Sequence, residues 1–134
     1  MRDFSPGRVF LIGAGPGDPE LMTLKAARLL QSADVVVHDR LVSDGIMAMI
    51  PDGVRLIDVG KMAGHHKLAQ DKINTLLVEL ALAGHRVVRL KGGDPLIFGR
   101  GSEEAEVLRA AGIPVEYVPG ITAAQGAAAA TGVP

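Results

Sequence analysis

The sequence has no cysteine and no tryptophan, and only one tyrosine and three phenylalanines among its 134 residues. Without cysteine there can be no disulfide, no thiolate nucleophile and no cysteine-ligated zinc or iron–sulfur site in this chain. Because aromatic residues are few, the core must be built from Val, Ile, Leu, Ala and Met. No window approaches 18 uncharged apolar residues, so the sequence predicts no membrane-spanning helix. Residues 1–7 also lack the apolar stretch of a signal peptide, and we expect a cytoplasmic protein.

The sequence also has no excess of positively charged residues. Fourteen Lys and Arg residues face 15 Asp and Glu residues, which gives a formal net charge of −1. Nucleic-acid-binding domains are usually strongly basic, so this balance argues against such a partner. Hydrophobic residues make up 48% of the chain and charged residues 22%, which indicates a folded globular domain rather than a disordered segment.

Short apolar runs alternate with longer amphipathic segments along the chain. Runs bounded by Gly and Pro predict strands, and apolar residues at helical spacing predict helices. The order indicates a five-stranded, mainly parallel sheet with helices on both faces. The expected strands are residues 8–12, 33–38, 54–59, 86–90 and 115–118, and the expected helices are residues 21–31, 44–49, 68–83, 102–111 and 121–130.

Chemically distinctive residues follow each expected strand. In a parallel α/β sheet, ligands bind at the edge where the carboxyl ends of the strands meet. Loops from all of the strands would converge there, which predicts a ligand site more firmly than any single loop. The loops are Gly13–Pro19, Asp39-Arg40, Gly60-Lys61, Gly92–Pro95 and Pro119–Thr122.

The first of these loops, Gly13-Ala14-Gly15-Pro16-Gly17, partly matches the dinucleotide-binding fingerprint. The match is poor, because the third glycine comes one residue too early for G-x-G-x-x-G. Pro16 also lacks the N–H group that a phosphate would bind, and Asp18 and Glu20 would repel a pyrophosphate. The loop is either a structural turn or, as we favour, a loop that contacts a ligand without phosphate.

Two further segments carry candidate binding residues. The glycines of Lys91–Pro95 would let the backbone approach a ligand, and Asp94 could accept hydrogen bonds; the alternative is a tight turn. Arg100 stands between glycines, which suits an arginine that binds a carboxylate, although it could be an ordinary surface residue. Glu103 and Glu104 suit the first turn of a helix through its dipole.

Titratable residues end two other expected strands. Asp39 and Lys61 could form an acid–base pair or a simple ion pair, and the residues alone leave both interpretations open. The adjacent histidines 65 and 66 are unsuited to chelating one ion, and His38 and His85 are far apart in sequence. We therefore expect no metal site.

Taken together, these motifs resemble the tetrapyrrole methyltransferase family. The resemblance extends over essentially the whole chain from Arg8, and it points to the branch that methylates uroporphyrinogen III rather than to the ribosomal-RNA or diphthamide branches. Ser102 departs from the second glycine of the family's R-G-G-E run. The matching segments are Gly13–Ala26, Asp39–Val42, Val59–Lys61, Arg86–Pro95, Phe98–Gly101 with Glu103-Glu104, and Val118–Ala123.

The resemblance implies an activity and a set of roles. The activity is methyl transfer from S-adenosyl-L-methionine to ring carbons of uroporphyrinogen III. The products are precorrin-2 and S-adenosyl-L-homocysteine. Precorrin-2 is an intermediate of sirohaem, cobalamin and haem d1 synthesis. Asp39 and Lys61 match a proton acceptor and donor. The polycarboxylate substrate would be held by Arg100 and Glu103, with Arg40 adding positive charge at the cleft. The implied cofactor contacts are Pro16, Gly92, Gly93, Asp94, Ile97, Thr122 and Ala123.

The resemblance also implies that residues 1–134 are the N-terminal half of a two-domain fold, in which the cofactor lies in the cleft between the domains. The chain ends at Gly132-Val133-Pro134, which we interpret as the interdomain connection. The expected partners are a small-molecule tetrapyrrole and a second copy of the protein. The two copies would associate as a homodimer or through the exposed cleft surface. We expect binding to neither nucleic acid nor a membrane. The alternatives are a non-catalytic α/β binding or assembly module and a dinucleotide-binding oxidoreductase domain.

Overall fold

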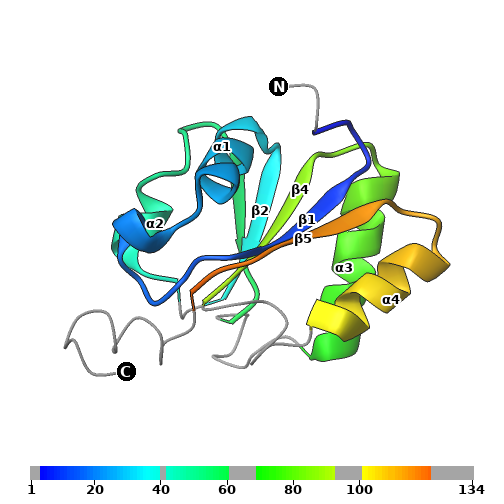
Figure 1. Ribbon diagram of the computed structural model, residues 1–134. Helices are drawn as coiled ribbons and strands as arrows, with labels where there is room; N and C mark the ends of the chain where they lie inside the picture. The colour runs from blue at the N-terminus through cyan, green and yellow to red at the C-terminus, as the bar shows by residue number, and fades with distance from the viewer. Residues whose placement is uncertain (1–3, 40–41, 61–68, 93–100, 122–134) are drawn as a thin grey trace.

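The computed structural model describes residues 4–39, 42–60, 69–92 and 101–121 (Figure 1). Five strands form one sheet in the order β3-β2-β4-β1-β5, and every pairing between these strands is parallel. The predicted five-stranded parallel sheet is therefore confirmed. The strands are β1 (Val9–Gly13), β2 (Val35–His38), β3 (Arg55–Asp58), β4 (Val87–Lys91) and β5 (Val115–Val118).

The helices follow the predicted segments closely, with one correction near the start of the chain. The segment predicted as one helix from residue 21 is a 3₁₀ turn, η1, followed by a separate helix, α1. The two are separate because Asp18 caps the turn and Thr23 caps the helix, where its hydroxyl accepts a hydrogen bond from Ala26 N at 3.1 Å. The elements are η1 (Pro19–Leu21), α1 (Leu24–Ser32), α2 (Asp44–Met47), α3 (Gln70–Leu82) and α4 (Gly101–Ala110). The helix predicted at 121–130 lies outside the described residues.

The ends of the two longest helices show why they stop where they do. Gly84 follows α3 with a φ of 89°, and Gly112 follows α4 with a φ of 77°. This left-handed conformation is easy for glycine and strained for other residues. The sequence therefore carries the stop signals of both helices locally.

The strand order also explains which helices cover which face of the sheet. From β1 the chain moves across the sheet to β2 and β3, and it then reverses direction to β4 and β5. Right-handed crossovers place α1 and α2 on one face and α3 and α4 on the other, as Figure 1 shows. The neighbouring strands β1 and β4 consequently lead to helices on opposite faces. In α/β sheets, ligands bind at the carboxyl ends of the strands where the strand order reverses in this way.

Two hydrophobic clusters fill the space between the sheet and its helices. Because side chains alternate along a strand, Phe10 and Ile12 of β1 pack toward α1 and α2, whereas Val9 and Leu11 pack toward α3 and α4. All five residues of β1 are buried, as are all five of β4. Within the ranges given above, no helix is long and apolar enough to cross a membrane.

Candidate functional site

The ends of β1, β2 and β4 meet at one edge of the sheet. Gly13 of β1 is in register with Lys91 of β4, and His38 of β2 is in register with Leu90. Ala14 N donates a hydrogen bond to Lys91 O at 2.6 Å, so the pairing continues one residue beyond β1. Three of the loops singled out in the sequence therefore leave the sheet side by side.

The loop after β1 has an unusual backbone. Gly15 and Gly17 have φ values of 75° and 118°, and Pro16 stands exposed between them. The side chain of Asp18 accepts a hydrogen bond from Glu20 N at 2.9 Å. This carboxylate therefore stabilises the turn that leads into η1.

Ser43 holds this loop against the N-terminus of α2. Its hydroxyl donates to Gly17 O at 2.7 Å and accepts from Ile46 N at 3.3 Å, so one side chain both caps the helix and binds the loop. The fit is close, because a Cβ placed on Gly45 would lie 3.0 Å from Pro19 Cγ. The loop that carries Pro16 is thus fixed relative to the sheet edge.

Four of the residues predicted as site residues lie within the described part of the chain. Asp39 follows β2 and Gly92 follows β4, and both are partly buried. Pro16 is exposed in the loop after β1, and Glu103 is exposed in the first turn of α4. The other predicted site residues lie outside the described residues: Arg40, Lys61, Gly93, Asp94, Ile97, Arg100, Thr122 and Ala123.

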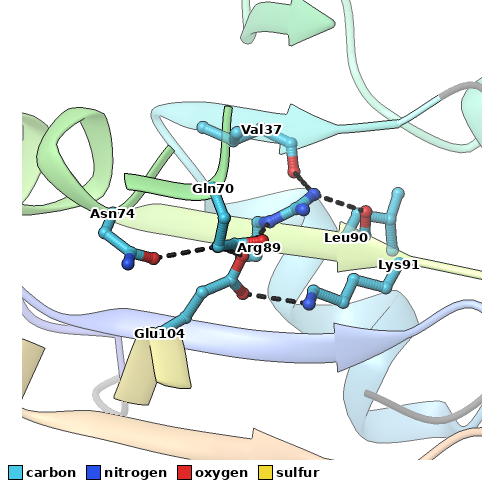
Figure 2. A network of polar contacts seen from close by, with 7 residues as sticks. All are labelled: Val37, Gln70, Asn74, Arg89, Leu90, Lys91 and Glu104. Atoms are coloured by element: carbon cyan, nitrogen blue, oxygen red, sulfur yellow. Dashed lines mark hydrogen bonds and ion pairs between the residues drawn. The ribbon is translucent and has the colours of Figure 1, made fainter. Parts of the chain in front are cut away.

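A buried charge cluster next to this edge was missed by the sequence interpretation (Figure 2). Glu104, assigned only a helix-dipole role, is 0% exposed, and its carboxylate contacts two cations of β4. Arg89 Nε lies 3.2 Å from Glu104 Oε2, and Lys91 Nζ lies 3.1 Å from Glu104 Oε1. We call Arg89, Lys91 and Glu104 the buried charge cluster.

Neutral groups complete the surroundings of the cluster. Gln70 Nε2 of α3 donates to Glu104 Oε2 at 3.0 Å and to Asn74 Oδ1 at 2.9 Å. The guanidinium of Arg89 also points to the carbonyl oxygens of Val37 and Leu90, each 3.5 Å from Nη1 (Figure 2). The cluster therefore joins α3, α4, β2 and β4 at the site edge.

A signal for this cluster was present in the sequence. Arg89 and Lys91 stand two residues apart in a strand of a sheet that is predicted to be covered on both faces, so both had to lie on the same covered face. Glu104 stands four residues before Leu108, which packs in the core against α3, and residues four apart share a helix face. Buried cations require a counter-charge, and Glu104 supplies it.

The electrostatics connect the cluster to Asp39. Burial lowers the pKa of Lys91 from the usual 10.5, and the nearby Arg89 lowers it further. The carboxylates of Glu104 and Asp39 act in the opposite direction. Asp39 follows His38, which is in register with Leu90, so Asp39 and Lys91 lie at the same edge of the sheet.

The described residues contain no group of three or more His, Asp or Glu side chains that could hold a metal ion. His38 Nδ1 lies 3.2 Å from the carbonyl oxygen of Asp39. The sequence predicted no metal site at the adjacent histidines 65 and 66. These two residues lie outside the described residues.

Comparison with known proteins assigns the fold to a family. Residues 8–134 match the model of the Tetrapyrrole (Corrin/Porphyrin) Methylases. The chain is 70% identical over 128 residues to uroporphyrinogen-III C-methyltransferase of Paracoccus denitrificans, an overlap of 96% of this chain and 45% of the relative. It is also similar to a crystal structure of uroporphyrin-III-C-methyltransferase from Thermus thermophilus, with a TM-score of 0.84 and 52% identity over 96% of this chain and 54% of that chain. A Thermus thermophilus structure complexed with S-adenyl homocysteine has a TM-score of 0.76 and 50% identity, over 95% of this chain and 49% of that chain.

The chain thus spans about half the length of the relatives that it matches. The family model covers nearly all of the chain, and the sequence relative and the structural neighbours bear names of the same kind of methyltransferase. This chain belongs to the tetrapyrrole (corrin/porphyrin) methylase family.

Proposed function

We propose that this chain is the N-terminal domain of an S-adenosyl-L-methionine-dependent C-methyltransferase that converts uroporphyrinogen III to precorrin-2. The observation that carries this proposal is the 70% identity, over 96% of the chain, to a relative named for that activity. The reversal of strand order between β1 and β4 supports it, because α/β sheets bind their ligands at the carboxyl ends of the strands at such a position.

The described residues fit S-adenosyl-L-methionine. Pro16 offers no N–H to a phosphate, and this cofactor has none. Gly92 is partly buried at the end of β4, and its lack of a side chain leaves the backbone open to a ligand. We propose cofactor contacts at both residues and, from the family resemblance, at Gly93, Asp94, Ile97, Thr122 and Ala123. When bound, the cofactor supplies an activated methyl group on a positively charged sulfur.

Asp39 is the proposed proton acceptor. Methylation of a ring carbon leaves a proton to be removed, and a carboxylate at the sheet edge can take it. The partial burial of Asp39 and its interaction with Lys91 support this role. Lys61 is the proposed proton donor on the strength of the family resemblance.

The substrate contacts proposed for this chain are Arg40, Arg100 and Glu103. Glu103 is exposed in the first turn of α4, directly before the buried Glu104. Its exposure leaves the side chain of Glu103 available to a ligand, while Glu104 anchors the helix to β4. The two arginines would neutralise carboxylates of the tetrapyrrole.

We further propose that residues 1–134 form one α/β domain, and that a second domain supplies the rest of the cofactor pocket and the contacts of a homodimer. The share of the relatives that the chain covers, 45% and 54%, supports this division. We propose a cytoplasmic location, in keeping with a small-molecule biosynthetic reaction that needs neither membrane nor nucleic acid.

A chimera tests the function with this chain's own residues. Residues 8–134 would replace the matching segment of the Paracoccus denitrificans relative, and the purified chimera would be incubated with uroporphyrinogen III and S-adenosyl-L-methionine. We expect mass spectrometry to detect the methylated product. A folded chimera that binds S-adenosyl-L-homocysteine and leaves uroporphyrinogen III unmethylated would disprove the substrate.

Calorimetry on the same chimera separates the remaining alternatives. We expect binding of S-adenosyl-L-methionine and S-adenosyl-L-homocysteine, and no binding of NADH. Tight NADH binding with no response to the other two ligands would indicate an oxidoreductase domain. Cofactor binding without turnover on any tetrapyrrole would indicate a non-catalytic module.

A further inference from the structure

The carboxylate of Glu104 holds together side chains from two other elements (Figure 2). Its Oε1 atom lies 3.1 Å from Lys91 Nζ and its Oε2 atom lies 3.2 Å from Arg89 Nε. Oε2 also accepts a hydrogen bond from Gln70 Nε2, the first residue of α3, at 3.0 Å. Glu104 is 0% exposed and belongs to the first turn of α4. A single side chain therefore ties the start of this helix to the end of β4 and to the start of α3.

The contact between Lys91 and Glu104 brackets the connection from β4 to α4. Lys91 directly precedes Gly92, which is a proposed cofactor contact. Glu104 directly follows Glu103, which is a proposed substrate contact. Consecutive Cα atoms are about 3.8 Å apart, so each proposed contact residue is joined covalently to one member of the buried ion pair. The ion pair consequently restrains where the two contact residues lie relative to one another.

The Glu104 contacts also set the rotation of α4 about its own axis. Successive residues of an α-helix are rotated by about 100°. With Glu104 directed at β4, the side chain of Glu103 must point in another direction, and Glu103 is exposed. A shift or rotation of α4 that broke the Glu104 contacts would move Glu103 with it.

The need for stability does not by itself account for these charges. Well-packed apolar side chains of similar volume often stabilise a protein as well as a buried ion pair does, and α4 already places the apolar Ala105 and Leu108 in the core. Charges add a different restraint, because any arrangement of α4 on β4 that separated Glu104 from its cations would leave buried charges without partners. The cluster therefore specifies the position of the helix more narrowly than apolar packing would.

We propose that Glu104 is a positioning residue for the proposed methyl transfer. Its contact with Lys91 keeps Gly92 and Glu103 at a fixed separation, so that cofactor and tetrapyrrole are aligned. This inference rests on the proposed function and on its contact residues. In the step it serves, an electron pair of the ring forms a bond from a ring carbon to the methyl carbon, the carbon–sulfur bond breaks, and its electron pair stays on sulfur. The ring then loses a proton to the proposed acceptor, Asp39.

The chimera with the Paracoccus denitrificans relative supplies the activity that tests this role. Glu104→Gln keeps the size of the side chain and removes its charge. A misplacement of about 1 Å can cost a rate factor of about 10², so we expect kcat/KM for uroporphyrinogen III to fall by about 10²-fold. The dissociation constant of S-adenosyl-L-homocysteine should stay the same. A folded Glu104→Gln chimera with wild-type kcat/KM would overturn the proposal.

Leu108→Ala is the matched control for loss of stability. Leu108 is 0% exposed on the same helix and packs in the core, so its truncation destabilises the fold without removing a charge from the cluster. We expect this variant to keep a kcat/KM near that of the wild type at a temperature where both variants are folded. Equal losses of kcat/KM in Leu108→Ala and Glu104→Gln would identify Glu104 as merely structural and overturn the proposal.

A combination of two substitutions gives a readout that a general loss of stability would not move. Because Glu104 acts through Glu103, Glu104→Gln should lower kcat/KM much less in a Glu103→Ala chimera than in the wild-type chimera. The same fold-change in both backgrounds would overturn the proposal. If Glu104→Gln fails to fold, Glu104→Asp takes its place in every measurement, since it keeps the buried negative charge and shortens the side chain by one methylene group.

Amide hydrogen exchange in the same chimera distinguishes the anchoring of the two contact residues from the proposed activity. Glu104→Gln should speed exchange in the peptides that contain Gly92 and Glu103, and should leave α1, on the other face of the sheet, unchanged. Unchanged exchange at Gly92 and Glu103 would overturn the proposal. An inactive wild-type chimera in which Glu104→Gln still speeds this exchange would instead overturn the proposed function and leave the anchoring by Glu104 standing.

Discussion

The carboxylate of Glu104 and the ammonium of Lys91 lie 3.1 Å apart, with both side chains almost entirely buried. One belongs to the first turn of α4 and the other to the last position of β4. Their contact fixes the start of the helix to the end of a central strand, directly beside the proposed reaction site. Glu104 and Arg89 form the second contact of the same cluster, at 3.2 Å, so the loss of Glu104 would leave two buried cations without their common partner.

Glu104→Ala should therefore be strongly destabilising. Removal of one partner from a buried ion pair typically lowers the free energy of unfolding by about 3–5 kcal/mol, and urea unfolding of the 134-residue chain measures the change. Glu106→Ala is the matched control, because Glu106 is exposed on the same helix, and it should unfold at nearly the wild-type urea concentration. Equal midpoints for the two variants would show that the cluster contributes little to stability.

The buried Lys91 should make stability depend on alkaline pH. Its pKa is lowered in the folded state from 10.5, so between the lowered value and 10.5 the unfolded chain binds more protons than the folded chain. Stability contributed by this group then rises with pH in that window. We expect the difference in free energy of unfolding between wild type and Lys91→Met to shift in favour of wild type as the pH rises toward 10.5. A shift in the opposite direction would contradict the lowered pKa.

Ser43→Ala should loosen the loop that carries Pro16. The substitution removes an N-cap, which usually lowers the free energy of unfolding by about 1 kcal/mol, and it also releases Gly17 O. We expect faster amide hydrogen exchange in residues 14–22, measured by mass spectrometry. Thr75→Ala is the control, because the Thr75 hydroxyl donates a hydrogen bond to Asp71 O within α3 at 2.9 Å. Unchanged exchange in Ser43→Ala would mean that the Ser43 contact does not hold the loop.

Asp39→Ala should separate turnover from binding in the chimera. Loss of a general base typically reduces the rate by about 10²–10⁴-fold, so we expect at least a 100-fold fall in kcat with little change in the dissociation constant of S-adenosyl-L-homocysteine. Steady-state kinetics and calorimetry provide the two numbers. A collapse of cofactor affinity with kcat preserved would assign Asp39 to binding.

The 134-residue chain alone should self-associate if it is half of a two-domain protein. A missing domain leaves apolar surface uncovered, and exposed apolar patches favour association. The apparent mass from light scattering should rise with concentration for the chain and should stay constant for the chimera. A monodisperse monomer at high concentration would count against this prediction.

Much of the fold could be predicted because its signals are local. Short apolar runs identified the five described strands, most of them bounded by Gly or Pro, and Gly84 and Gly112 mark the ends of α3 and α4 through their left-handed backbone. Alternation of strand and helix was enough to predict a parallel sheet covered on both faces. The misplaced start of α1 had a local cause too, since two capping residues, Asp18 and Thr23, follow each other closely.

The family also followed from the sequence, because its motifs are ordered segments that need no knowledge of spatial neighbours. The roles proposed for Asp39 and the other site residues came from that resemblance and stay predictions. The pairing of Asp39 with Lys61 stays open, since residue 61 lies outside the described part of the chain.

Only the tertiary structure decided which strands are neighbours and which charges are buried. An apolar run identifies a strand and says little about its partners, so the order β3-β2-β4-β1-β5 had to come from the fold. Likewise, two adjacent glutamates look alike in a sequence, yet Glu103 faces solvent and Glu104 faces the core. The physical reason is that burial depends on what packs against a residue, and the residues that enclose Glu104 come from α3 and β4, far from it along the chain.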